Sequence, residues 1–242
     1  MLLRCLRAEL IKCKRSPVWV AFLVLPLFPA VLGTFNYLSN LGVLQDQWYS
    51  LWTQHTLFAS MFFLPAQFGV FCAWQWRLEH VDHNWNSAMT APVPARDLYF
   101  AKLIVDVGIS LLSMACIGLL FVLSGKLAGL SAPLPPELFG WLLFGALGGI
   151  VVCAVQLLLS LVIRAFAVPV AIGLVGGIMG LLFTSQGWGN CFPYSLLCLG
   201  MRANNPSMAL PLPAFFAGCI FFLLLCSFLS IRFLTHRDVT TG

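Results

Sequence analysis

Apolar residues fill most of this chain in six long runs, and short polar segments separate the runs. They cover about residues 17–37, 57–76, 100–124, 138–162, 166–185 and 212–233. A hydrocarbon core about 30 Å thick needs roughly 20 apolar residues of helix, so each run is long enough to cross a membrane. The pattern predicts an all-α membrane protein with six transmembrane helices in residues 17–242, the fifth of them short and rich in glycine.

The composition agrees with this architecture. Of the 242 residues, 60% are hydrophobic and 9% are charged, whereas soluble proteins average about 25% charged residues. The net charge of +5 is small and scattered, so we expect no nucleic-acid partner. The first apolar run is longer than that of a signal peptide and has no small-residue cleavage site, which predicts a retained first span.

The basic residues predict the orientation of the chain. If the N-terminus is cytoplasmic, all but two of the 13 lysine and arginine residues lie on the inner side, the exceptions being Lys126 and Arg202. Positive residues favour the cytoplasmic side of a membrane, so we expect both termini there. The outer loops would then carry an aromatic belt made of Trp48, Tyr49, Trp52 and Trp188.

Residues 1–16 predict an amphipathic helix. Apolar residues at helical spacing alternate with basic ones before Pro17 turns the chain into the bilayer. Such a helix would lie against membrane lipid in the inner interface; the alternative is a charged flank that only enforces topology. The polar residues of interest on this helix are Arg7, Glu9, Lys12 and Arg15.

One long polar segment, residues 77–98, interrupts the apolar pattern between the second and third runs. Its first part has neither glycine nor proline and carries an apolar stripe that includes Trp85 and Met89, whereas Pro92 and Pro94 end the helical pattern. A cytoplasmic helix with one apolar stripe is suited to fit a groove on a partner protein.

The same segment could instead hold a metal or an acid–base pair, because Glu79, His80, Asp82 and His83 are close together. Zinc hydrolase helices place the acid between their histidines, as HExxH, and need a third ligand from elsewhere. This spacing differs and the other inner segments offer no third ligand, so we expect no metal site. We expect these four side chains to face solvent or a partner protein.

The residues Glu79, His80, Trp85, Pro92, Val93, Arg96, Tyr99 and Lys102 form the pattern E-H-x4-W-x6-P-V-x2-R-x2-Y-x2-K. This pattern resembles the first cytoplasmic loop of ABC-2-type transporter permeases, and looks closest to the bacteriocin-immunity group that protects bacteria against lantibiotics and has bacitracin-resistance relatives. The start, Arg7-x-Glu9-x-x-Lys12-x-Lys14-Arg15-Ser16, is similar to the N-terminal elbow helix of that group.

The resemblance implies a bacterial cell-membrane permease whose loop holds a coupling helix. In such transporters two permeases work with two separate ATPase subunits, which bind ATP and magnesium. This chain has no GxxxxGK[ST] motif of its own, so we expect no cofactor and no enzymatic activity in it. The ATPase interface implied by the resemblance consists of Glu79, His80, Asp82, His83, Trp85, Met89, Pro92 and Arg96.

Three polar residues within the apolar runs are candidates for function, because burial in lipid is costly. Asp106 follows Lys102 by four residues, so we expect these two to pair near the inner interface, with a proton relay as the alternative. Gln67 and Gln156 are expected to hydrogen-bond between helices.

The outer segment 185–211 is too polar for a span and too apolar for a free loop. The resemblance implies short re-entrant helices here. Cys191 and Cys198 share this segment in an oxidising compartment, so a disulfide is one option. On a straight helix they would be about 10 Å apart, so the bridge requires a bend, which Pro193 could supply.

The leading hypothesis, which rests on the resemblance, is a permease subunit that expels an amphipathic antimicrobial peptide with energy from ATP hydrolysis by its partners. Its second permease would be the same or a sister chain. The alternatives are an ABC-2 exporter of a lipid-like or other small amphipathic cargo, and a non-transporting membrane anchor or sensor. An intramembrane enzyme is disfavoured, because no serine–histidine, paired-aspartate or HExxH constellation is present.

Overall fold

The computed structural model describes residues 1–14, 16–80 and 93–236, and these residues form helices joined by short connections without a β-strand. In chain order the elements are α1 (Leu2–Cys13), α2 (Val18–Val24), α3 (Leu27–Ser39), α4 (Gln47–Phe58), the π-helix η1 (Ala59–Phe63), α5 (Leu64–His80), α7 (Ala95–Leu127), α8 (Leu138–Val162), α9 (Ala167–Ser185), the 3-10 helix η2 (Gly189–Cys191), α10 (Pro193–Gly200) and α11 (Leu212–His236).

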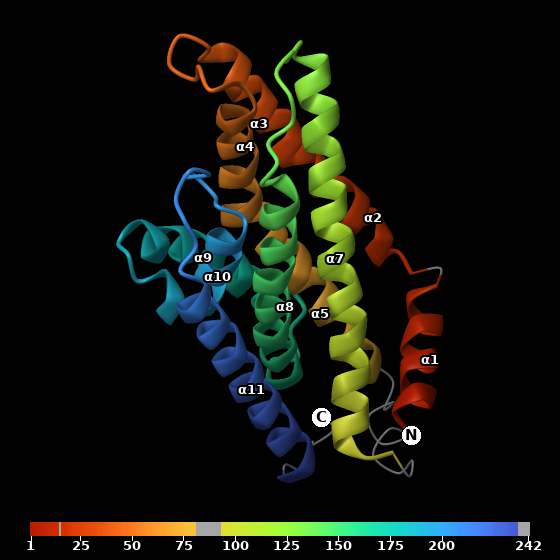
Figure 1. Cartoon of the computed structure of the whole chain (residues 1–242). Coiled ribbons are helices and arrows are strands. Elements are labelled where there is room, and N and C mark those ends of the chain that lie inside the picture. The colour runs from red at the N-terminus through yellow and green to blue at the C-terminus, as the bar shows by residue number, and fades with distance from the viewer. Residues whose placement is uncertain (15, 81–92, 237–242) are drawn as a thin grey trace.

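The predicted fold class is confirmed. Six segments of the described chain are long and apolar enough to cross a membrane. They are Val18–Ser39, Gln47–His80, Ala95–Leu127, Leu138–Val162, Ala167–Ser185 and Leu212–Thr235. The N-terminus and the end of α11 lie at the same end of the bundle (Figure 1), which we call the inner end by the orientation expected from the sequence.

Two spans are longer than the apolar pattern indicated. The second and third contain 34 and 33 residues, so at 1.5 Å per residue each is about 50 Å long. Their length exceeds the hydrocarbon thickness, and α4 and the end of α7 rise above the upper ends of α8 and α11 (Figure 1). The sequence underestimated both helices because polar residues flank their apolar runs: the second span begins ten residues earlier than expected, and the third begins five residues earlier, with Arg96 and Asp97.

The prediction that four aromatic residues form a belt at the outer interface is wrong for two of them. Trp48 and Trp52 belong to α4 and their side chains are buried, with exposures of 1% and 0%. Both rings make edge-on contacts with Phe121, and the indole N–H of Trp52 donates to the Met201 carbonyl at 2.9 Å. These two tryptophans join α4 to α7 and to the chain after α10. Trp188, in contrast, is 65% exposed.

The second span contains a π-helical turn whose cause is visible in the sequence. Pro65 has no N–H to donate to the carbonyl of Met61 one turn earlier, and its ring would clash there in a regular helix. The wider turn η1 relieves this conflict. Helix α9 packs against this turn: a Cβ atom added to Gly177 would lie 2.4 Å from the Met61 carbonyl oxygen.

The outer segment, for which the resemblance implied short re-entrant helices, contains the short buried helix α10. Helix α10 packs against α8 and α9, and Leu196, Leu197 and Cys198 have no exposed surface. The disulfide option is not realised: Cys191 and Cys198 are both free thiols, the first exposed in η2 and the second buried in α10. The bend at Phe192–Pro193 directs the two side chains to different environments instead of bringing them together.

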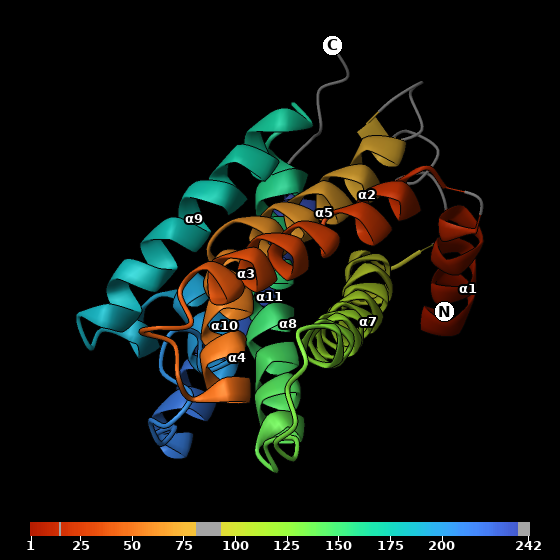
Figure 2. The same ribbon diagram turned by 90° about the horizontal axis from the view of Figure 1, so that it is seen from above.

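Helices α1 and α9 lie at opposite edges of the bundle (Figures 1 and 2). Helix α1 packs beside the lower part of α7. Three of its apolar side chains, Leu3, Leu10 and Ile11, stay exposed at 74%, 52% and 71%, so they are available to membrane lipid. Glu9 and Cys13 are buried against the bundle.

Candidate functional site

Four charged side chains from three helices meet at the inner end of the bundle. Glu9 and Lys12 come from α1, Glu79 from the last turn of α5 and Lys102 from the second turn of α7. We call these four residues the ion cluster. Glu79 stands just before residues 81–92 in the chain, and Lys102 lies on the helix that follows them, so the cluster connects both ends of the polar segment to the N-terminal helix.

Lys102 is the centre of the ion cluster. Its side chain has no exposed surface, and its ammonium donates to Glu9 Oε2 at 3.0 Å, to Glu79 Oε1 at 3.1 Å and to the Gln75 carbonyl at 3.2 Å. An ammonium has three N–H donors, so all of them are used. The charge also lies 4.9 Å from the centre of the Trp76 ring, a distance typical of a cation–π contact.

Lys12 closes the ion cluster from its exposed side. Its ammonium donates to Glu9 Oε1 at 2.8 Å and also to Glu79 Oε1. Burial alone would lower the pKa of Lys12, but the negative charges and hydrogen bonds of Glu9 and Glu79 outweigh burial and raise it. Lys12 therefore stays protonated at neutral pH, and the cluster is electrically balanced with two cations and two carboxylates.

The predicted pairing of Asp106 with Lys102 is wrong. Asp106 instead accepts a hydrogen bond from the Gln75 amide on Oδ1 and a contact from the Cys72 thiol on Oδ2 at 3.7 Å. Helical side chains slope toward the N-terminus of their helix. Lys102 therefore reaches back toward α1 and the end of α5, while Asp106 lies one turn deeper in the bundle.

The predicted hydrogen bonds of the two intramembrane glutamines are confirmed. The Gln67 amide donates to Ser113 Oγ at 2.9 Å and joins α5 to α7, and the Gln156 amide donates to the Tyr194 hydroxyl at 2.9 Å and joins α8 to α10.

Within the described ranges no three His, Cys, Asp or Glu side chains are close enough together to hold a metal ion.

The residues predicted to contact an ATPase differ in their burial. Glu79 is 6% exposed and lies inside the ion cluster, so its carboxylate faces the bundle and not a partner. His80 is half-buried, with a ring nitrogen 3.4 Å from the Ser160 carbonyl oxygen, whereas the Arg96 side chain is 73% exposed. The others, Asp82, His83, Trp85, Met89 and Pro92, lie outside the described residues, as does Arg15 of the elbow segment.

The ion cluster itself was missed by the sequence reasoning, which placed Glu9 and Lys12 on a surface helix and Lys102 beside Asp106. One signal was present. Glu9 is the single acid among the first fifteen residues and sits between basic neighbours, a position that an interfacial helix does not require. The other end of α1 is also held, because the N-terminal ammonium lies 3.9 Å from Asp97 Oδ2 at the start of α7.

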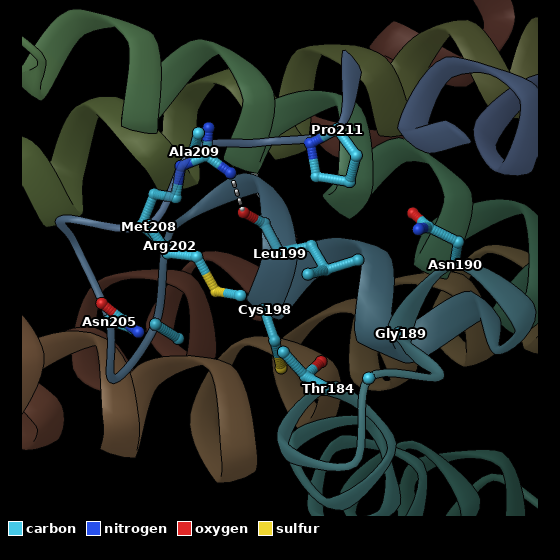
Figure 3. A pocket seen from close by; sticks show the side chains of 12 residues that line it. Thr184, Gly189, Asn190, Cys198, Leu199, Arg202, Asn205, Met208, Ala209 and Pro211 are labelled. Carbon is cyan, nitrogen blue, oxygen red and sulfur yellow. Dashed lines mark hydrogen bonds between the residues drawn. The ribbon is translucent and has the colours of Figure 1, made fainter. Parts of the chain in front are cut away.

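A second polar feature lies between the end of α9 and the start of α11. A pocket of about 140 Å³ is enclosed by the residues around η2, α10 and the connection to α11. In it Arg202, Asn205 and Met208 lie on one side and Asn190 on the other (Figure 3). None of these residues was expected from the sequence to form a site.

Comparison with known proteins gives the family. A family model described as ABC-2 family transporter protein matches residues 5–180. This range includes every member of the ion cluster and leaves α10 and α11 outside. Neither the curated proteins nor the solved structures contain a match. The chain therefore belongs to the ABC-2 family of membrane transporter proteins.

Proposed function

We propose that this chain is the permease subunit of an ABC transporter that expels an amphipathic antimicrobial peptide from a bacterial cell membrane. ATP and magnesium bind to two ATPase subunits, and a second permease, the same or a sister chain, completes the transporter. Membership of the ABC-2 family implies a partner ATPase. The peptide cargo is supported by the resemblance of Glu79–Lys102 and of the N-terminal segment to the lantibiotic-immunity group.

The ion cluster is the observation that carries the coupling role. A partner that moves the polar segment 77–98 pulls on the end of α5 and on the start of α7, and both are joined to α1 through Lys102 and Glu79. Moving a charged side chain out of water costs several kcal/mol per ion, so a protein is strongly destabilised when a buried ion pair loses one partner. The three helices therefore move together at this end, and the displacement passes into the spans.

The orientation of the chain is part of the proposal. Both the asymmetry of lysine and arginine residues and the position of the N-terminus and the end of α11 at one end of the bundle (Figure 1) support cytoplasmic termini. The ion cluster then lies on the ATPase side, and exposed Arg96 is a candidate for direct contact with that partner.

Co-expression with the ATPase tests this function. We expect the tagged chain to retain the ATPase during purification and to give ATP-dependent protection of cells against an amphipathic peptide. Loss of the ATPase under all mild conditions would contradict the permease role. Retention of the ATPase with ATP-driven lipid movement but no peptide protection would favour the lipid-like cargo, and retention without any ATP-driven transport would favour the anchor or sensor.

For the interface, Arg96→Ala has a matched control in Arg232→Ala, an exposed arginine near the end of α11. We expect Arg96→Ala to weaken retention of the ATPase and Arg232→Ala to leave it unchanged.

A further inference from the structure

Three adjoining cavities form one groove at the outer side of the bundle. The pocket of about 140 Å³ shares Arg202, Met208 and Ala209 with a wider cavity of about 690 Å³. The wider cavity shares Tyr49 and Ser207 with a third, of about 430 Å³. We call the three together the outer groove, and the volumes of its two larger cavities are in the range of ligand pockets.

Arg202 lies where the first two cavities join. Among the described residues no acidic side chain is within ion-pair distance of its guanidinium, which makes only a long hydrogen bond of 3.5 Å to the Leu199 carbonyl (Figure 3). Burial lowers the pKa of Arg202, yet an arginine stays protonated in proteins. A partly desolvated cation without a counter-ion is a site for an anion.

The backbone around Arg202 is strained. Arg202 and Asn204 have φ angles of 54° and 65°, in the left-handed region that a residue with a side chain seldom adopts. Such strain persists where the surrounding structure enforces it, and it is concentrated at ligand sites and switches. Here the residues with this conformation include Arg202, which lines both of the first two cavities.

The wide cavity is also lined by a residue of the other charge. Glu137 lines it and accepts a hydrogen bond from the Tyr49 hydroxyl at 2.9 Å. Apolar rings complete the lining: Phe139 and Phe144 of α8 belong to the cavity, and Phe144 contacts Phe216 on α11. The groove therefore offers a cation, an anion and an apolar wall that continues along the membrane-facing helices.

We propose that the outer groove binds the headgroup of an amine-bearing zwitterionic phospholipid from the outer leaflet. The phosphate lies on Arg202, the ammonium lies on Glu137, and the acyl chains follow Phe139 and Phe144. The opposite charges of the two side chains match those of the headgroup, and one groove contains both. This site is independent of the cargo proposed above, because it rests on a different end of the molecule.

Native mass spectrometry of the purified full-length chain tests this site, with phosphatidylethanolamine and phosphatidylglycerol as probes. We expect wild type to bind phosphatidylethanolamine about tenfold more tightly than phosphatidylglycerol. Arg202→Gln should lose most binding of either lipid, and Arg202→Lys should keep part of it. Glu137→Gln should retain phosphate binding and lose the preference for the amine, whereas Lys126→Gln, an exposed cation outside the groove, should bind as wild type does.

Three results would overturn the proposal. One is undiminished phosphatidylethanolamine binding by a folded Arg202→Gln variant, checked by its thermal unfolding. Another is equal binding of the two lipids by wild type. The third is displacement of the bound lipid by an equimolar cationic amphipathic peptide, which would make the groove a peptide site.

Discussion

At the scale of single residues, Lys102 is the side chain on which the inner end depends most. It is fully buried and is bonded to carboxylates of two other helices. Its neighbours explain why such a charge is tolerated in a membrane-spanning helix: all three donors have acceptors, and an aromatic ring covers the charge. Lys126, at the other end of the same helix, is exposed and carries none of these contacts.

Replacement of Lys102 by methionine should therefore destabilise the protein strongly. The change leaves two buried carboxylates with Lys12 as their single cation, and the loss of one partner of a buried ion pair costs about 3–5 kcal/mol. We expect a clearly lower unfolding temperature in detergent, followed by circular dichroism, and no change for Lys126→Met.

The double variant Lys102→Met, Glu9→Gln supplies the charge control. It leaves Glu79 with Lys12, so much of the lost stability should return. Equal unfolding temperatures for the single and double variants would show that packing, and not charge balance, is what Lys102 provides.

At the scale of elements, the contact between the second span and α9 is built from backbone on both sides. The π-helical turn before Pro65 leaves the Met61 carbonyl facing α9, and the missing side chain of Gly177 allows that close approach. Gly108, on α7, has no atom within 4 Å of an added Cβ, so it is a matched position without this constraint.

Gly177→Ala should consequently lower stability, by about 1–3 kcal/mol, because the added methyl group overpacks a contact with rigid backbone. Gly108→Ala should be neutral or stabilising, since alanine favours a helix more than glycine does. Unfolding titrations in a denaturing detergent would compare the two, and a Gly177→Ala protein as stable as wild type would refute the close contact.

The sequence predicted elements better than it predicted contacts. Six spans follow from apolar run lengths, and the bonds of Gln67 and Gln156 follow from the cost of burying amides. The ion cluster could not be found this way, because Glu9 and Lys102 are 93 residues apart and their meeting depends on how α1 packs on α7. Trp48 and Trp52 were expected in an outer loop because polar residues surround them in the sequence, whereas both belong to helix α4.

At the scale of the whole molecule, the chain has two polar ends with different designs. The inner end has balanced charges that are paired with one another, which suits transmission of force. The outer end has in one groove a glutamate and an arginine, Arg202, that forms no ion pair with any described residue, which suits a ligand. Between the two ends, Gln67 joins α5 to α7 and Gln156 joins α8 to α10 through hydrogen bonds.

The orientation of the molecule can be checked through Cys191, which is exposed and free beside the outer groove. A membrane-impermeant maleimide added to intact cells should label the chain without prior reduction, and Cys191→Ser should abolish the signal. Labelling that appears only after reduction would indicate a disulfide, and labelling that requires permeabilised cells would place this end in the cytoplasm.

The central claim is that the ion cluster transmits ATPase movement to the spans, and Glu79→Gln tests it most directly. The measurement is the amount of peptide protection per ATP hydrolysed by the complete transporter. Glu79 accepts charge-assisted hydrogen bonds from Lys102 and Lys12, each worth about 1.5–3 kcal/mol. We therefore predict that Glu79→Gln retains the ATPase and lowers this ratio about tenfold or more. An unchanged ratio in a variant that still holds the ATPase would contradict it.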